Sequence, residues 1–102
     1  MDDVIRKHIE IVEGARGPKA RIAGHRIRVV DIVVWHEKLG ISPDRIVHDY
    51  AGLTLADVHA ALAYYWDNRD AIEAAIEADQ QLYDELRQRH PSRLQELLQS
   101  RA

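Results

Sequence analysis

The sequence contains no cysteine, no low-complexity segment and no long uncharged apolar run. Without cysteine the chain has no disulfide framework and no thiolate that could act as a nucleophile or metal ligand. Its apolar runs are far shorter than the roughly 18 residues that a membrane-spanning helix needs. The acidic start Met1-Asp2-Asp3 is unlike a signal peptide. We therefore expect a soluble protein of the cytoplasm.

Motifs for catalysis and metal binding are also missing. The six histidines are scattered, with no HExxH pattern and no pair four residues apart: His8, His25, His36, His48, His59 and His90. Gly14 and Gly17 lack the lysine spacing of a phosphate-binding loop, and no paired carboxylates stand out. The sequence thus predicts no enzyme, no metal and no cofactor.

What is present fits one small globular domain. The 102 residues are 46% hydrophobic and 30% charged, which is enough for a small core. The net charge of −3 is unevenly distributed, because residues 1–30 carry seven Lys or Arg against four Asp or Glu, a net of +3. Four of these basic residues are predicted DNA contacts on a β-ribbon or arm: Lys19, Arg21, Arg26 and Arg28. The alternative is a solvated loop face.

Residues 42–65 predict two helices joined by a short turn. Ser42 is a good N-cap and Pro43 suits the first helical position. Gly52 can adopt positive φ at the corner. Thr54 and Asp57 have the spacing of a capping box that begins the second helix. This pattern is typical of a helix-turn-helix.

The second helix has an apolar face and a solvent face on this pattern. The predicted buried positions are Leu55, Val58, Leu62 and Tyr65, and the outward ones are Ala56, Asp57, His59, Ala60 and Ala63. The outward set lacks Arg, Lys, Asn and Gln, so the helix is a poor reader of base edges. Its alanines form either a dimer or partner seam, or a run chosen for helix propensity. Trp35 and Trp66 are expected in the core.

The N-terminal part predicts short strands. Residues 8–13 are rich in β-branched residues, and residues 20–23 and 27–30 are expected to form two more short strands around Gly24. Asp31 is the expected cap of a helix that ends at Gly40. The predicted fold is therefore mainly α with a short N-terminal β region. Residues 1–66 hold the N-terminal strands and a helix-turn-helix-like three-helix core, and a C-terminal helical tail for partner binding occupies residues 67–102.

The tail has a narrow apolar stripe surrounded by charge. Its predicted anchors are leucines on either side of Pro91: Leu82, Leu86, Leu94, Leu97 and Leu98. Such a helix gains stability when another surface covers the stripe, so we predict that it binds a partner. The alternative is a self-dimerising coiled coil.

Five separated pieces of residues 17–65 together resemble domain of unknown function family 433. They are residues 17–32, 39–42 and 46–50, the pair Leu53-Thr54, and Ala60-Ala61-Leu62-Ala63-Tyr64. His25 and Ala51 depart from the family pattern, in which Thr and Pro are usual.

The resemblance implies a helix-turn-helix-like fold and, for many members, the role of a VapB-type antitoxin. Such an antitoxin inhibits a PIN-like ribonuclease toxin encoded beside it and represses its own operon. Arg87, Arg89 or Arg93 could then pair with the carboxylates of the nuclease metal site. Expected partners are the toxin, operator DNA and a second copy of the chain. The alternatives are a free-standing DNA-binding regulator and a structural dimerisation module.

Overall fold

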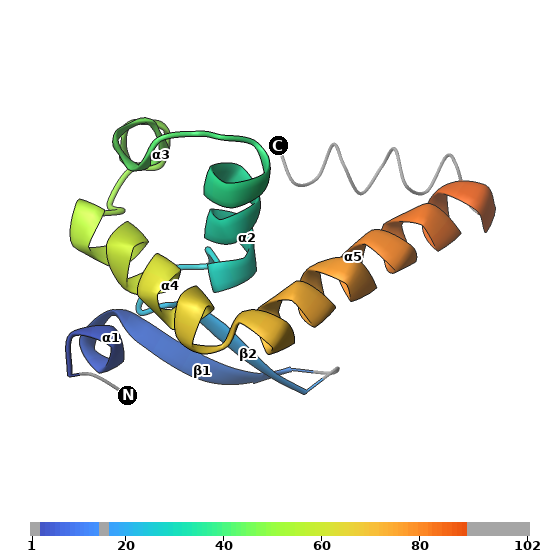
Figure 1. The fold of residues 1–102 in the computed structure, drawn as a ribbon, viewed down its shortest axis with the longest axis horizontal. Helices are drawn as coiled ribbons and strands as arrows, with labels where there is room; N and C mark the ends of the chain where they lie inside the picture. The colour runs from blue at the N-terminus through green and yellow to red at the C-terminus, as the bar shows by residue number, and fades with distance from the viewer. Residues whose placement is uncertain (1–2, 15–16, 90–102) are drawn as a thin grey trace. The chain divides into compact units, whose positions relative to one another are not determined.

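The structure, a computed structural model, describes residues 3–14 and 17–89 and is mostly helical in these ranges. The elements follow one another as α1 Asp3–His8, β1 Ile9–Gly14, β2 Gly17–Ile22, α2 Val29–Val33, a π-helical turn Val34–Lys38, α3 Pro43–Asp49, α4 Leu55–Asp67 and α5 Arg69–Arg89 (Figure 1). The chain divides into two compact units, Met1–Ile72 and Glu73–Ala102. No described helix is both long enough and apolar enough to cross a membrane.

The two strands form an antiparallel hairpin, with a register running from Ile9 opposite Ile22 to Gly14 opposite Gly17. A third strand over 27–30 is a wrong prediction, because only Arg28 makes a β-bridge, to Arg21. The chain turns into α2 directly after this bridge.

The cap of α2 also differs from the expectation. Arg28 occupies the N-cap position, and Asp31 lies in the first turn, where its Oδ2 accepts a hydrogen bond from the Arg28 backbone N–H at 3.0 Å. Asp31 therefore stabilises the helix start from inside the helix. The helix also begins earlier than predicted, so the β-branched residues Val29 and Val30 belong to it.

The segment between α2 and α3 ends at Gly40, as predicted, with φ of 71°. A π-helical turn precedes it, and the backbone N–H of Ile41 donates to the Trp35 carbonyl at 2.9 Å. Trp35 is half-buried and stacks on Tyr50 with ring centroids 4.5 Å apart. Leu39 is exposed, because the wider turn carries it away from the core.

The two helix caps and the positive φ of Gly52 that were predicted for residues 42–57 are confirmed. The Ser42 hydroxyl accepts from the Arg45 backbone N–H at 3.1 Å, with Pro43 in the first turn of α3. Gly52 has φ of 84°. Thr54 and Asp57 form a reciprocal capping box at the start of α4, with both hydrogen bonds at 3.1 Å.

The core of the Met1–Ile72 unit lies around α4, which packs against α1, α2, α3 and the hairpin (Figure 1). Its largest fully buried side chains are Ile22, Val29, Ile32, Val33, Ile46 and Val58. Burying each of these side chains is worth roughly 1.5–3 kcal/mol. Because they come from β2, α2, α3 and α4, the core joins elements distant in sequence.

The corner before α4 yields a first testable prediction. Gly52→Val should lower the free energy of unfolding by about 1 kcal/mol or more, since a β-branched residue resists positive φ. In addition, a Cβ at this position would lie 3.2 Å from Cε1 of His25. Urea denaturation followed by circular dichroism measures the loss.

Gly24→Ala is the control for this experiment. Gly24 also has positive φ, but a Cβ there would meet nothing within 4 Å. Gly52→Ala should therefore destabilise more than Gly24→Ala. Equal losses would show that the His25 contact contributes nothing.

Candidate DNA-contact and partner-binding surfaces

Two of the four predicted DNA contacts are in ion pairs within the protein. The Arg21 Nε donates to Glu10 Oε1 at 2.7 Å across the hairpin, and Arg28 Nη2 donates to Asp31 Oδ1 at 3.1 Å. The hydrogen bond from Arg21 lowers the pKa of Glu10, so this carboxylate keeps its charge in mildly acidic solution. Arg21 and Arg28 can therefore reach a phosphate only in competition with these carboxylates.

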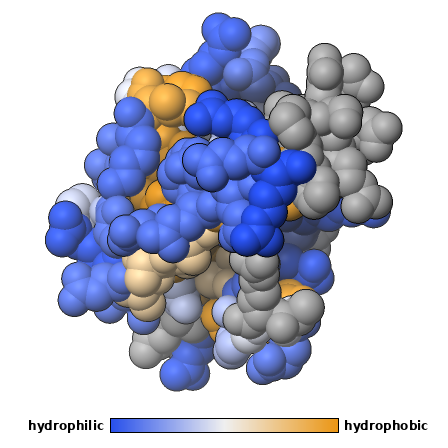
Figure 2. All heavy atoms as spheres, turned by 90° about the vertical axis from the view of Figure 1, so that its right-hand side faces the viewer, coloured by the Kyte–Doolittle hydropathy of each residue, from blue (hydrophilic) through white to orange (hydrophobic). Residues whose placement is uncertain are grey.

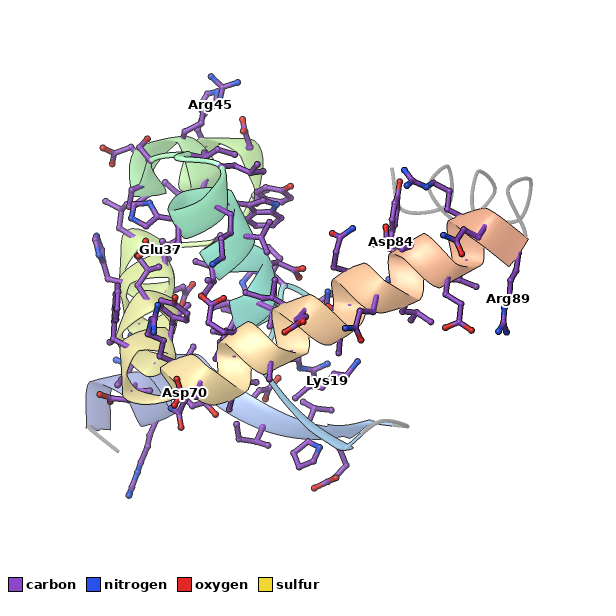
Figure 3. The ribbon with its side chains drawn as sticks, turned by 45° about the vertical axis from the view of Figure 1, so that its right-hand side comes forward. Lys19, Glu37, Arg45, Asp70, Asp84 and Arg89 are labelled. Carbon is purple, nitrogen blue, oxygen red and sulfur yellow. The ribbon has the colours of Figure 1, made fainter. Side chains whose placement is uncertain are left out.

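The other two predicted contacts, Lys19 and Arg26, are exposed. Lys19 lies on β2 (Figure 3) and shares one face of the hairpin with Arg21, two residues further along the strand. The β-bridge places Arg21 beside Arg28. The structure thus brings Lys19, Arg21 and Arg28 onto one ribbon, while Arg26 lies in the loop between β2 and α2.

The first turn of α4 carries a contact that the sequence did not predict. Asp57 is buried, and its Oδ1 lies 2.8 Å from Nδ1 of His8 at the end of α1. Burial tends to raise the pKa of Asp57, but the hydrogen bonds from Thr54 and His8 together lower it. The expectation that Asp57 faces solvent is therefore wrong, because the capping box and His8 hold it inside.

The faces of α4 also differ from the prediction. Val58 and Tyr65 are buried as expected and Leu62 is half-buried, but Leu55 is 42% exposed and Ala60 is buried. Trp66 is 59% exposed, so its assignment to the core is wrong. Its neighbour Tyr65 is buried, so the last turn of α4 still contacts the core and the indole lies on the solvent side of the helix. The solvent side of α4 carries no Arg, Lys, Asn or Gln.

The helix α5 extends over 21 residues, of which Ile72 is the buried one. Leu82 and Leu86 of the predicted stripe are half-buried. Arg87 lies 5.9 Å from the centre of the Tyr83 ring. Arg89 is exposed in the last turn (Figure 3), and its Nη1 lies 2.9 Å from Oε1 of Glu85. Arg93, Leu94, Leu97 and Leu98 lie outside the described residues.

The charge of α5 is distinct from that of the N-terminal part. Three arginines against six acidic residues give Arg69–Arg89 a net charge of −3. On the face drawn in Figure 2, hydrophilic side chains dominate and the hydrophobic ones form separate patches. In the described ranges no group of three or more His, Asp or Glu could hold a metal ion.

Comparison with known proteins identifies relatives of this chain. A crystal structure of a DUF433 member protein from Anabaena variabilis is similar, with a TM-score of 0.63 and 33% sequence identity over 72% of this chain and 71% of that chain. No curated protein matches. The family model described as "Protein of unknown function (DUF433)" matches residues 9–65, more than half of the sequence. This chain therefore belongs to the DUF433 family.

Proposed function

We propose that this protein is the antitoxin of a type II toxin–antitoxin pair, which binds and inhibits a PIN-like ribonuclease and represses its own operon. The antitoxin role follows from the sequence resemblance described above. The observation that carries the proposal for this chain is α5, a long acidic helix with a narrow apolar stripe and exposed arginines near its end. An isolated helix of this kind gains most of its stability by packing against another surface.

A ribonuclease is the partner whose chemistry fits α5. An enzyme that binds RNA presents basic groups to the phosphates, and the net charge of −3 on α5 is complementary to such a surface. Leu82 and Leu86 would then bind in an apolar groove of the nuclease. Arg87 and Arg89 can exchange their surface contacts for the carboxylates of its metal site, because guanidinium binds carboxylate in bidentate geometry.

The test is copurification from cells that coexpress this chain, carrying an affinity tag, with the untagged nuclease encoded beside it. We expect the nuclease to copurify and to cleave RNA only after it is separated from the complex. A nuclease that neither copurifies nor loses activity in the presence of excess tagged chain would contradict the proposal.

We infer further that α3, the Gly52 turn and α4 form a helix-turn-helix-like unit that serves as a scaffold. The confirmed caps and the positive φ of Gly52 support this arrangement. The α4 surface lacks the side chains that read base edges. We therefore place the DNA contacts on Lys19, Arg21, Arg26 and Arg28, with the exposed pair Lys19 and Arg26 contributing most.

The DNA proposal predicts a change in the salt dependence of operator binding. Lys19→Ala and Arg26→Ala should each weaken binding and reduce the slope of log K against log salt by about 1, since one phosphate contact is lost. His59→Ala, on the solvent side of α4, should leave the slope unchanged. Fluorescence anisotropy at several salt concentrations measures both quantities. A larger effect of His59→Ala would place α4 in the groove instead.

A further inference from the structure

A strip of four apolar residues and one histidine runs along the solvent side of α4. We call it the α4 strip, and it consists of Leu55, Ala56, His59, Ala63 and Trp66, all of them exposed. Its members follow one another at spacings that keep them on one side of a helix. The opposite side of α4 carries Val58, Ala61 and Tyr65, which are buried in the core of the same unit. The helix is therefore mostly apolar on both sides, with His59 as the polar member of the strip.

This pattern is unusual for a surface helix. The solvent side of an amphipathic helix is normally charged or polar, and a helix that is apolar all round is normally buried. The α4 strip contains no Asp, Glu, Lys or Arg, and its largest member, Trp66, is 59% exposed. Exposed apolar surface of this kind marks an interaction site.

We propose that a second copy of this chain covers the α4 strip, with the two α4 helices packed antiparallel about a two-fold axis. The strip has a bulky end at Trp66 and a smaller one at Ala56. An antiparallel arrangement brings the indole of each copy, the largest side chain of the strip, onto the smaller Leu55 and Ala56 of the other copy at both ends. Ala63 near the middle lets the helix axes approach to about 8 Å.

The charges at the ends of the strip favour the same arrangement. Asp67 is exposed at the C-terminal end of α4, where the helix dipole is unfavourable to its carboxylate. In the antiparallel pair it lies beside the partially positive N-terminus of the other α4. The Arg69 guanidinium is 6.0 Å from the Trp66 ring centre, so a cation borders the apolar contact. The result is an apolar centre with a charged rim, as in stable interfaces.

The inference is independent of the toxin proposal. All its residues belong to the Met1–Ile72 unit, whereas the predicted nuclease contacts from Leu82 onward lie in the other unit. A nuclease that fails to bind would leave the dimer intact. Failure of the chain to dimerise would not change the expectation that α5 binds the nuclease.

Disulfide crosslinking tests the geometry, because the natural chain has no cysteine. His59→Cys and Ala63→Cys are made separately in the full chain, and one of them carries a tag that changes its mass. The antiparallel register places position 59 opposite position 63 of the other copy. Positions 59 and 59 are about 6 Å further apart along the axes, given a rise of 1.5 Å per residue.

We expect mixed samples to form the 59–63 crosslink under mild oxidation at least tenfold faster than either variant crosslinks with itself. Self-crosslinking that is faster than mixed crosslinking would show a parallel or shifted pair and overturn the proposal. Absence of any crosslink would also overturn it.

Self-association measured by sedimentation gives an independent readout. We expect the unmodified chain, of 11.7 kDa, to sediment as a dimer, and Ala63→Glu to raise the dissociation constant at least tenfold by placing a charge in the seam. Ala74→Glu puts the same charge on an exposed position of α5 and should leave the constant unchanged. Trp66→Ala should weaken the dimer without introducing a charge.

A monomeric chain would mean that no second copy covers the strip. A dimer insensitive to both Ala63→Glu and Trp66→Ala would place the interface elsewhere. Either result overturns the proposal.

Discussion

Deletion of residues 79–102 is expected to abolish binding to the neighbouring ribonuclease and to release its activity. The deletion removes five leucines: Leu82, Leu86, Leu94, Leu97 and Leu98. Each leucine buried in a groove contributes roughly 1.5–3 kcal/mol. Losing two of them at the lower value already costs about 3 kcal/mol, or about a hundredfold in affinity. A pull-down together with an RNA-cleavage assay measures both effects.

The truncated chain should still fold. The buried apolar residues of the described structure end at Ile72, so the two described leucines of the deleted segment, Leu82 and Leu86, do not belong to that core. Circular dichroism and a thermal melt check this expectation. If the truncated chain still binds and silences the nuclease, the α5 assignment is wrong and the partner site lies in the Met1–Ile72 unit.

Changing the arginines alone should separate binding from inhibition. With Arg87, Arg89 and Arg93 replaced by alanine, the complex should largely persist on the leucines while inhibition falls, because nothing then pairs with the carboxylates of the nuclease. Arg45→Ala is a suitable control, since Arg45 is exposed on α3 (Figure 3) and pairs only locally with Asp49. It should change neither binding nor inhibition.

The local features of the fold could be predicted because their causes are close in sequence. The caps at Ser42 and Thr54 involve partners three residues away, and Gly52 needs only its own backbone. The prediction of a third strand over residues 27–30 was wrong for a related reason. β-Branched residues favour strands, but the hydrogen bond from the Arg28 backbone to Asp31 turns the chain into α2.

Contacts between distant residues could not be read from the pattern. His8 and Asp57 are 49 positions apart, and nothing near either residue indicates the pair. The exposure of Trp66 depends on which side of α4 faces the core, so residue type alone gave the wrong answer. For the basic residues, the missing information was the hairpin register. The predicted strands place Glu10 and Arg21 in one β region, but only the register puts them opposite each other.

Replacing Asp57 is expected to have the largest effect on stability of any single change at the start of α4. Asp57→Ala should lower the free energy of unfolding by about 1–3 kcal/mol. The change removes the acceptor for the Thr54 backbone N–H and the partner of His8, whose side chain is 19% exposed. Urea denaturation at neutral pH measures the loss.

Asp57→Asn is the matched variant, because its amide oxygen can still accept the capping hydrogen bond but carries no charge. It should lose less stability than Asp57→Ala. His8→Ala removes the pair and keeps the cap, so a double-mutant cycle with Asp57→Asn gives the coupling between the two side chains. Additive losses would show that the 2.8 Å contact contributes nothing.

The difference in unfolding free energy between the unmodified protein and Asp57→Asn should also depend on pH. Its direction is fixed by the pKa of Asp57. This pKa is lower in the folded protein than in the unfolded chain, so the folded state binds the proton less readily. The stability contributed by the ionised carboxylate is therefore fully present above about pH 4, the usual range for aspartate, and is lost as the pH falls through the folded value. The advantage of the unmodified protein over Asp57→Asn should shrink on acidification below about pH 4. An advantage that grows there would mean that burial, which raises the pKa, outweighs the hydrogen bonds from Thr54 and His8.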